Sequence, residues 1–406
     1  MVKLLIALPL FAFVLVIADA ATTNRCPSYC RYKLGTKAPN TTLRVRKDIK
    51  CMTEKEWKDF ADAVTELHAR GIFDRYNFVH VRYFYVIHDS AQFFPWHRWF
   101  LFLFENELRK INPTVTIPYW DGAVDFVHPE LSEVFNATRA GGSGDPNDNF
   151  CVKDGLVAGW IRQFPSKVCV KRNFGSEPMV WHSPEWTTHL LQAGLDYDSF
   201  REGLEFSMHA LMHGAVGGPQ GELMWPWGPN DIIFFFLHAN IDRIWAKWQL
   251  ADPQNFYDYG GPLRDISTNT TVGLADQSDK LDPWDMETKE ALVFGREPMP
   301  YTYDEFLSDV AEKEETEGIK RIKQLPKVVL QRYYPKIIDG TATRFHYELP
   351  PTCGEEILPF FPPPVPINPL TLAVRGFNAD RAMRVQADSN SLVETLNLVG
   401  YQSPYV

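Results

Sequence analysis

The sequence predicts a mainly helical protein with a loop-rich surround and a C-terminal extension of different character. Five stretches carry apolar residues at the spacing of an amphipathic or buried helix. Residues that begin or end helices flank several of these stretches, and the segments between them are rich in Gly, Pro, Asn and Asp. The chain has 406 residues, 45% of them hydrophobic, so it can bury a sizeable core.

Three of the predicted helices lie in the first third of the chain. The first begins after Thr53, whose hydroxyl is suited to cap it, and stops near Gly71. The second covers about 72–84. The third has Pro95 in its first turn, where proline is tolerated, and runs to about Lys110.

Two further helices are expected in the second half. Residues 197–212 show helical spacing and are followed by several glycines and a proline that end the helix. Residues 232–250 are strongly apolar, which predicts a helix buried on all sides.

The remaining segments show little periodicity. Residues 112–185 predict a long, loop-rich excursion. Beyond about residue 310 the composition changes, and we expect strands over 328–344. The chain therefore divides into a main domain of residues 21–310 and a C-terminal extension of residues 311–406.

The first twenty residues are typical of a secretory signal peptide. Lys3 supplies the positive start, residues 4–17 are apolar, and Ala18-Asp19-Ala20 has the form of a cleavage site. The apolar run is short for a membrane span, which needs about 20 residues, so we expect no stable membrane anchor. The protein is expected to be extracellular or in the lumen of a secretory-pathway organelle.

Cysteine usage and glycosylation motifs agree with export. The six cysteines are an even number, and three Asn-x-Thr acceptors are present, at Asn40, Asn136 and Asn269. We favour a Cys151–Cys169 disulfide, with Cys26, Cys30 and Cys51 securing the N-terminal arm. A four-cysteine zinc site is the rival, but the spacing lacks paired C-x2-C units.

The charge balance argues against one class of partner. The formal net charge is −10 and the sequence has no basic cluster, so nucleic acid is not expected to bind.

Two clusters of histidines indicate metal chemistry. His209 and His213 stand four residues apart, which places both rings on one helical face within reach of one ion. By themselves they could equally be two surface or core histidines. In the first half of the chain, His80 lies on the second predicted helix, His88 in the following loop and His97 on the third helix; this arrangement can converge on an ion in a helix bundle.

His238 strengthens the second cluster because it lies in a very apolar segment. A buried imidazole needs partners for both ring nitrogens. A metal on one nitrogen and a hydrogen bond from the other would satisfy it, and Asp242, four residues on, is a candidate for that bond. The alternative is that Asp242 pairs with Arg243 or Arg98.

The ligand type narrows the metal. Imidazole suits copper, zinc, iron and nickel. Dinuclear zinc sites and non-haem iron sites usually include a carboxylate ligand, and no such ligand is evident beside these six histidines. Two three-histidine copper centres are the best match, so we expect two copper ions per chain.

The segments around the histidines resemble the copper motifs of the tyrosinase family, the type 3 copper proteins that also include catechol oxidases and molluscan haemocyanin units. The first motif includes Phe94-Pro95-Trp96-His97-Arg98, and the second runs from His209 to Trp245. Tyr301-Thr302-Tyr303 resembles the tyrosine motif that closes the core of the family. The resemblance spans about residues 50–305.

This resemblance implies a four-helix bundle, a ligand set and an activity. His80, His88 and His97 would bind the first copper, and the second would be bound by His209, His213 and His238. Dioxygen would bind between the ions, and phenols would be converted to o-quinones, the precursors of melanin-like polymers. Glu205 would orient a water that deprotonates the phenol; otherwise it is a solvated helix residue.

Three departures from the family pattern bear on the substrate. Leu237 stands where many members have a further histidine, and no cysteine lies between His80 and His88 to form a thioether bridge. Ala210 follows His209, where members active on monophenols often have an asparagine that helps orient the water. Oxidation of o-diphenols is therefore the firmer expectation, with monophenol hydroxylation left open.

Two alternatives remain at this stage. One is a cuticle or matrix protein that kept the fold and lost the chemistry, which the intact set of six ligands argues against. The main one is a haemocyanin-like oxygen carrier, although carriers usually occur as many units, and a single unit with its own signal peptide favours the enzyme. The resemblance also implies that residues 311–406 cover the copper site, with Phe345 or Tyr347 filling the pocket. The other histidines are expected to be structural or on the surface: His68, His128, His182, His189 and His346.

Overall fold

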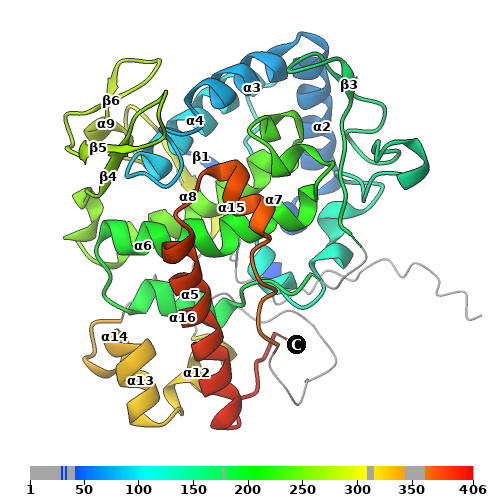
Figure 1. The fold of residues 1–406 in the computed structure, drawn as a ribbon. Coiled ribbons are helices and arrows are strands. Elements are labelled where there is room, and N and C mark those ends of the chain that lie inside the picture. Colours follow the sequence, from blue (N-terminus) through cyan, green and yellow to red (C-terminus); the bar gives the residue numbers. More distant parts are fainter. Residues whose placement is uncertain are drawn as a thin grey trace, which may run out of the picture.

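The computed structural model describes residues 29–30, 33, 42–175, 179–308, 315–342 and 362–405. These residues are mainly helical, and the helices gather around one central bundle (Figure 1). The bundle is made by four helical segments: α3 (Ile72–Tyr83), α4 (Phe93–Ile111), α6 with α7 (Tyr197–Leu204 and Ala210–Gly217) and α8 (Ile233–Ala251). The predicted fold class is confirmed.

Helix α2 (Glu54–Ala69) packs against α3 and α4 and begins as expected. The Thr53 side chain accepts from the backbone N–H of Glu56, and the Glu56 side chain accepts from the backbone N–H of Thr53. This capping box satisfies two N–H groups that the helix itself leaves unpaired. The apolar face at helical spacing, which includes Trp57 and Phe60, is buried in the core.

Helices α4 and α8 form the centre of the bundle. In α8 every residue except Leu250 is buried, as expected for a helix that is hydrophobic on all sides. Helix α4 buries most of its length against α8, including His97. Both metal-site clusters are thereby anchored on the most enclosed elements.

The helix expected over 197–212 contains an irregularity. Between α6 and α7 the residues Glu205–His209 form a π-helical turn, and α7 continues to Gly217. A π turn inserts one extra residue and is often found at functional sites. It ends on His209, so this turn sets where that ring points.

Short strand pairs and turns complete the main domain. Strand β1 (Arg44–Arg46) pairs in parallel with β8 (Tyr301–Tyr303), which joins the two ends of this domain. The other strands are β2 (Ile161–Arg162), β3 (Val168–Cys169), β4 (Pro262–Arg264), β5 (Thr271–Leu274), β6 (Lys280–Leu281) and β7 (Met286–Glu287). The other helices of this part are α5 (Pro184–Gln192), α9 (Thr288–Ala291) and α10 (Asp304–Leu307).

The region 112–185 is loop-rich, as predicted. It contains 3-10 turns at Gly122–Asp125, Pro129–Leu131, Glu133–Phe135 and Pro146–Asp148. The predicted Cys151–Cys169 disulfide is present and closes one loop of this region. A second disulfide joins Cys30 and Cys51 at the N-terminal arm. Cys26 lies outside the described residues.

The C-terminal extension differs from the prediction. No strands form over the described part of 328–344; this stretch holds α13 (Lys327–Tyr333) and α14 (Pro335–Ile338). Val329, Leu330 and Tyr333 share one helical face that is buried, so the apolar run follows the helical and not the strand period. The other helices here are α12 (Glu317–Lys323), α15 (Pro369–Arg375) and α16 (Ala379–Leu398).

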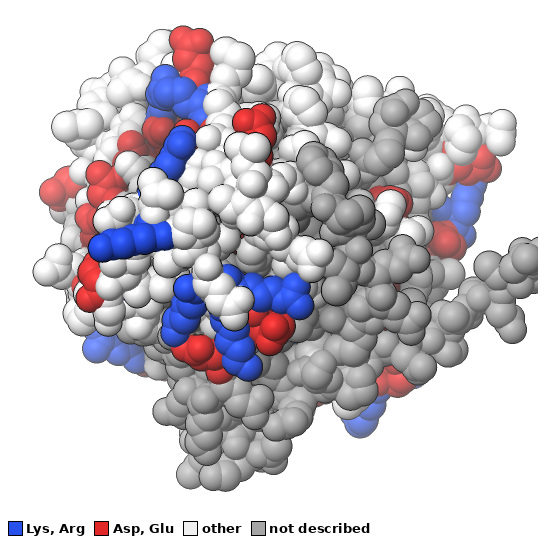
Figure 2. Space-filling model, turned by 90° about the horizontal axis from the view of Figure 1, so that it is seen from below, with Lys and Arg blue, Asp and Glu red and all other residues white. Residues whose placement is uncertain are grey.

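The last two helices return to the bundle. Helix α15 packs on α7, and α16 runs along α6 and the π-helical turn, as the orange and red ribbons show (Figure 1). On the face seen from below, Lys and Arg side chains lie in mixed clusters with Asp and Glu, without a field of one sign on its described part (Figure 2). In the described ranges, no helix has the length and hydropathy to cross a membrane.

Candidate metal centre

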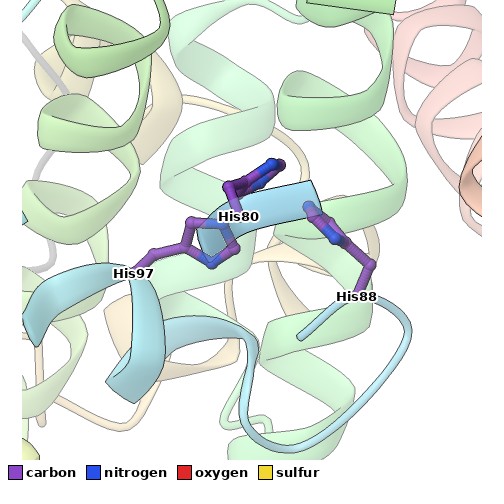
Figure 3. A group of neighbouring side chains, drawn as sticks. All are labelled: His80, His88 and His97. Carbon is purple, nitrogen blue, oxygen red and sulfur yellow. The ribbon is translucent and has the colours of Figure 1, made fainter. Parts of the chain in front are cut away.

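The six predicted histidines form two buried groups. The first triad is His80, His88 and His97, and the second triad is His209, His213 and His238. In each triad, one ring nitrogen per residue lies within 4.8 Å of the corresponding nitrogens of the other two. Figure 3 shows the rings of the first triad turned toward one another, from α3, from the loop after it and from α4.

The two triads adjoin each other. The His97 and His238 rings stack with centroids 4.3 Å apart, and those of His88 and His209 are 5.6 Å apart. The Nε2 atoms of His213 and His238 are 3.3 Å apart. The six rings therefore line one common space between the bundle helices.

Backbone carbonyls orient four of the rings. In each case the ring Nδ1 donates to a backbone carbonyl. His80 donates to Pro226 O (2.6 Å), His88 to Phe84 O (2.8 Å), His97 to Phe93 O (2.8 Å) and His213 to Leu223 O (2.7 Å). A carbonyl oxygen only accepts, so in a neutral ring the proton is on Nδ1 and Nε2 keeps its lone pair. This arrangement is the usual way in which proteins orient metal-binding imidazoles.

Several ring nitrogens have no partner in the described part of the chain. They include Nε2 of His80, Nε2 of His97 and both nitrogens of His209. Buried polar atoms without a partner are rare and call for an explanation such as a bound ion. A set of convergent imidazole lone pairs without carboxylate or thiolate fits copper.

Burial keeps the imidazoles neutral. It lowers the pKa of all six rings well below the ordinary value, to about 3 for His97, and neighbouring rings reinforce the effect for the other five. The neutral form is the one that ligates a metal, so the site is ready to bind at neutral pH without first losing protons.

Aromatic rings enclose the site. Phe93 packs against rings of both triads, with centroids 5.0 Å from His97 and 4.8 Å from His209. Phe234 lies 4.2 Å from His238 and 5.0 Å from His80, measured between ring centroids. Because both phenylalanines are fully buried, they form an apolar wall around the nitrogens.

Asp242 is placed differently from the proposal that it orients His238. Its carboxylate accepts from Arg98 Nε at 2.6 Å and from the hydroxyls of Tyr301 (2.6 Å) and Tyr303 (2.5 Å). No hydrogen-bond partner is present for His238 Nδ1 among the described residues. The alternative pairing with Arg98 is therefore the observed one, and Asp242 ties α8 to α4 and to the tyrosines of β8.

Glu205 is buried and not solvated. One carboxylate oxygen accepts from the backbone N–H of Asp89 at 2.7 Å, and the other accepts from Arg201 at 2.6 Å. Burial raises its pKa to about 7, against the opposing effect of Arg201. Since Asp89 directly follows His88, Glu205 supports the loop that carries this ligand.

The remaining histidines lie outside the triads. His68 stacks on Trp160, His128 is exposed beside Glu130, and His189 donates to Tyr333 O. His182 is buried with both ring nitrogens lacking partners within the described ranges. His346 and the two suggested pocket-filling residues, Phe345 and Tyr347, lie outside the described residues.

Sequence reasoning missed three features of the site: the backbone carbonyls that orient the rings, the π-helical turn, and Arg375. The guanidinium of Arg375, at the end of α15, lies with Nη1 3.5 Å from His88 Nε2. Nothing in the local sequence marks this arginine as part of the site, because the two residues are 287 positions apart.

Known proteins share this architecture. A family profile described as the common central domain of tyrosinase matches residues 62–251. The chain is 30% identical over 288 residues to a tyrosinase from Streptomyces antibioticus, a match that covers 64% of this chain and 100% of that protein. The chain belongs to the tyrosinase family. It is thus an oxidoreductase of the phenol oxidase type, and its buried triads are consistent with a type 3 dinuclear copper centre.

Two further relatives agree. A grixazone synthase from Streptomyces griseus is 29% identical over 320 residues, which covers 65% of this chain and 100% of that protein. Among solved structures, a polyphenol oxidase from Thermothelomyces thermophila has a TM-score of 0.53 at 22% identity, covering 64% of this chain and 88% of that one. The structural likeness supports a shared fold.

Proposed function

We propose that this tyrosinase-family protein oxidises o-diphenols to o-quinones with dioxygen, using one copper ion held by each histidine triad. The observation that carries the proposal is the convergence of neutral, buried imidazole nitrogens in two adjoining triads. Copper bound there would supply the dioxygen binding and the electron transfer that phenol oxidation requires.

The protein's own residues would bind and orient. The carbonyls of Phe84, Phe93, Pro226 and Leu223 fix four rings with Nε2 toward the centre. Phe93 and Phe234 keep the surroundings apolar, which strengthens electrostatic interactions inside and limits water. The phenolic substrate would approach this enclosed centre as the neutral species.

Glu205 is the candidate proton acceptor. Its pKa near 7 is suited to a group that takes a proton at neutral pH. Ala210, beside His209, has no polar side chain to help hold a water for monophenol deprotonation. For this reason we assign o-diphenols as the main substrates and treat monophenols as secondary.

We further propose that the protein is secreted and that its C-terminal extension covers the centre. The two disulfides support an oxidising compartment. Helix α15 packs on α7, which carries His213, and the Thr371 hydroxyl contacts Met224 Sδ at 3.5 Å. Residues 362–405 would then have to move before a phenol could enter.

The test is a copper-loading and turnover experiment. We expect the purified protein to take up two copper ions per chain and to oxidise an o-diphenol faster than a monophenol, if necessary after displacement of the C-terminal extension. His213→Ala should abolish turnover, whereas His189→Ala, outside the triads, should retain it. Reversible oxygen binding without turnover of either phenol would instead indicate a carrier.

A further inference from the structure

Arg375 reaches into the metal centre from the C-terminal extension. It is the last residue of α15 and is 1% exposed. Its Nη2 donates to Leu223 O at 3.0 Å, the same carbonyl that accepts from His213 Nδ1 at 2.7 Å. Its Nη1 lies 3.5 Å from His88 Nε2. One guanidinium thus contacts a ring of the first triad and also the carbonyl that orients His213 of the second triad.

This buried cation has no carboxylate partner within ion-pair distance in the described part of the chain. Its Nε also lacks a hydrogen-bond partner there. Phe84 offers only a cation–π contact, with the guanidinium carbon 5.8 Å from the ring centroid. The carboxylate of Glu205 favours the charge, but it forms no ion pair with Arg375 within 4 Å, and burial is the larger effect. A buried charge without a close partner is costly, so a purely structural role would be served better by an uncharged side chain.

The contact with His88 involves the lone pair that a metal needs. Because His88 Nδ1 donates to Phe84 O, its Nε2 is the acceptor in the neutral ring. An arginine has donors and no acceptors, so its N–H donates to this nitrogen. A nitrogen lone pair that accepts this proton cannot coordinate copper at the same time, and a guanidinium beside a copper ion adds like-charge repulsion.

We propose that the guanidinium of Arg375 takes the place of a copper ion beside His88. Docking of α15 and binding of copper at the first triad therefore oppose each other. The inference rests on the proposed ligand set and extends it to the control of metal loading. Linkage makes the opposition reciprocal: the docked helix weakens copper binding, and copper favours release of the helix.

The segment that follows α15 is attached to the loop that carries His88. Asp89, next to His88, accepts from the backbone N–H of Asn378 at 3.1 Å and pairs with Arg381 at 2.8 Å. Gly376 has a φ of +63°, and a Cβ there would lie 2.3 Å from Asn269 Nδ2, so a larger residue would be strained and would have to displace the Asn269 side chain. Arg375 and the ligand loop are therefore held by the same segment.

The experiment compares full-length wild type with Arg375→Gln and with a control, Arg384→Gln. Arg384 lies on α16 and is exposed, so its substitution removes the same charge from the same segment without touching the centre. Chelator-stripped proteins are titrated with copper against a competing chelator, and hydrogen exchange of residues 369–375 is measured with and without copper.

We expect Arg375→Gln to bind the first-triad copper roughly tenfold more tightly or better, with Arg384→Gln equal to wild type. In wild type, copper should speed exchange in α15, and this effect should be lost in Arg375→Gln. The inference is overturned if wild type binds two copper ions while α15 stays fully protected, or if both variants match wild type in copper affinity. Failure of wild type to bind copper would instead contradict the proposed function itself, and the inference with it.

Discussion

Two carboxylates beside the centre have different surroundings, and these define their roles. Asp242 is shared by Arg98 and two tyrosines, and these partners hold its pKa below the ordinary value despite burial. The Glu205 carboxylate accepts hydrogen bonds from one arginine and one backbone N–H. The effect of burial outweighs these contacts, so the pKa of Glu205 rises to about 7. Asp242 is therefore a fixed charge that joins elements, and Glu205 is the residue that we propose as the proton acceptor.

Glu205→Gln tests this assignment. The glutamine side chain retains an acceptor for the Asp89 N–H but cannot take a proton, so we expect two copper ions per chain and a fall in kcat of about 100-fold or more. Asp198→Asn is the control, since Asp198 also pairs with Arg201 but does not contact the His88 loop. Metal analysis and steady-state kinetics check the result, and unchanged kcat in Glu205→Gln would rule out the proton-acceptor role.

Glu222 predicts a pH dependence of stability. Burial raises its pKa to about 7, opposed by Arg162. A carboxyl with a raised folded-state pKa stabilises most below its unfolded value of about 4.3, and this contribution is lost as pH rises through about 7. Between pH 4 and pH 8 the free energy of unfolding of the copper-free chain should therefore fall more in wild type than in Glu222→Gln, by on the order of 3 kcal/mol.

Denaturant unfolding at the two pH values measures this difference. Glu394→Gln serves as the control because Glu394 is exposed on α16. Equal pH dependence in wild type and Glu222→Gln would show that folding does not raise the pKa of Glu222.

Single residues also show where sequence reasoning succeeds and where it stops. The i, i+4 spacing pointed to His209 and His213 and the apolar segment to His238, while the assignment of all six histidines to two triads rested on the resemblance to the family's copper motifs. The partners of their Nδ1 atoms could not be predicted, because a backbone carbonyl is present at every residue and its direction depends on the fold. Asp242 was assigned by its spacing from His238, but Arg98 on α4 competes for it successfully.

At the scale of elements, α15 and its end decide how the extension meets the bundle. Gly376 adopts a left-handed conformation that terminates α15 and permits its close contact with Asn269. Any side chain at this position adds backbone strain and a steric clash. The junction is thus a weak point at which the extension can be loosened without altering a histidine.

Gly376→Ala should loosen the extension. We expect faster proteolysis of residues 362–405 and a several-fold rise in diphenol turnover of the uncleaved protein, with two copper ions per chain at saturating copper and tighter copper binding than in wild type. Gly340→Ala is the matched control: Gly340 also has a positive φ, +75°, but a Cβ there meets nothing within 4 Å. If both variants behave as wild type, the junction does not hold the extension closed.

Elements with a clear period were predicted, and those without one were not. The capping box before α2 and the apolar face of α8 place these helices within one or two residues. The π-helical turn Glu205–His209 has no sequence signature separate from a regular helix. In the extension, the apolar residues around Val328 are compatible with both a strand and a helix. Their packing against the core stabilises the helix.

On the scale of the whole molecule, the centre exists because distant segments meet. Strand β1 pairs with β8 across more than half of the chain, and the Asp242 ion pairs join α8 to α4 beneath the histidines. The first triad draws its ligands from α3, α4 and the loop between them, and the second from the π-helical turn, α7 and α8, so neither site forms without the bundle. The extension then adds Arg375 to the same space from residues far along the chain.

The claim that each histidine triad holds one copper ion is tested most directly by the copper content of variants in each triad. Wild type should bind two copper ions per chain, His97→Ala and His238→Ala about one each, and the double variant none. His182→Asn is the control, since His182 is equally buried and also lacks ring partners in the described structure, yet belongs to neither triad. Two copper ions retained in the double variant would contradict the account.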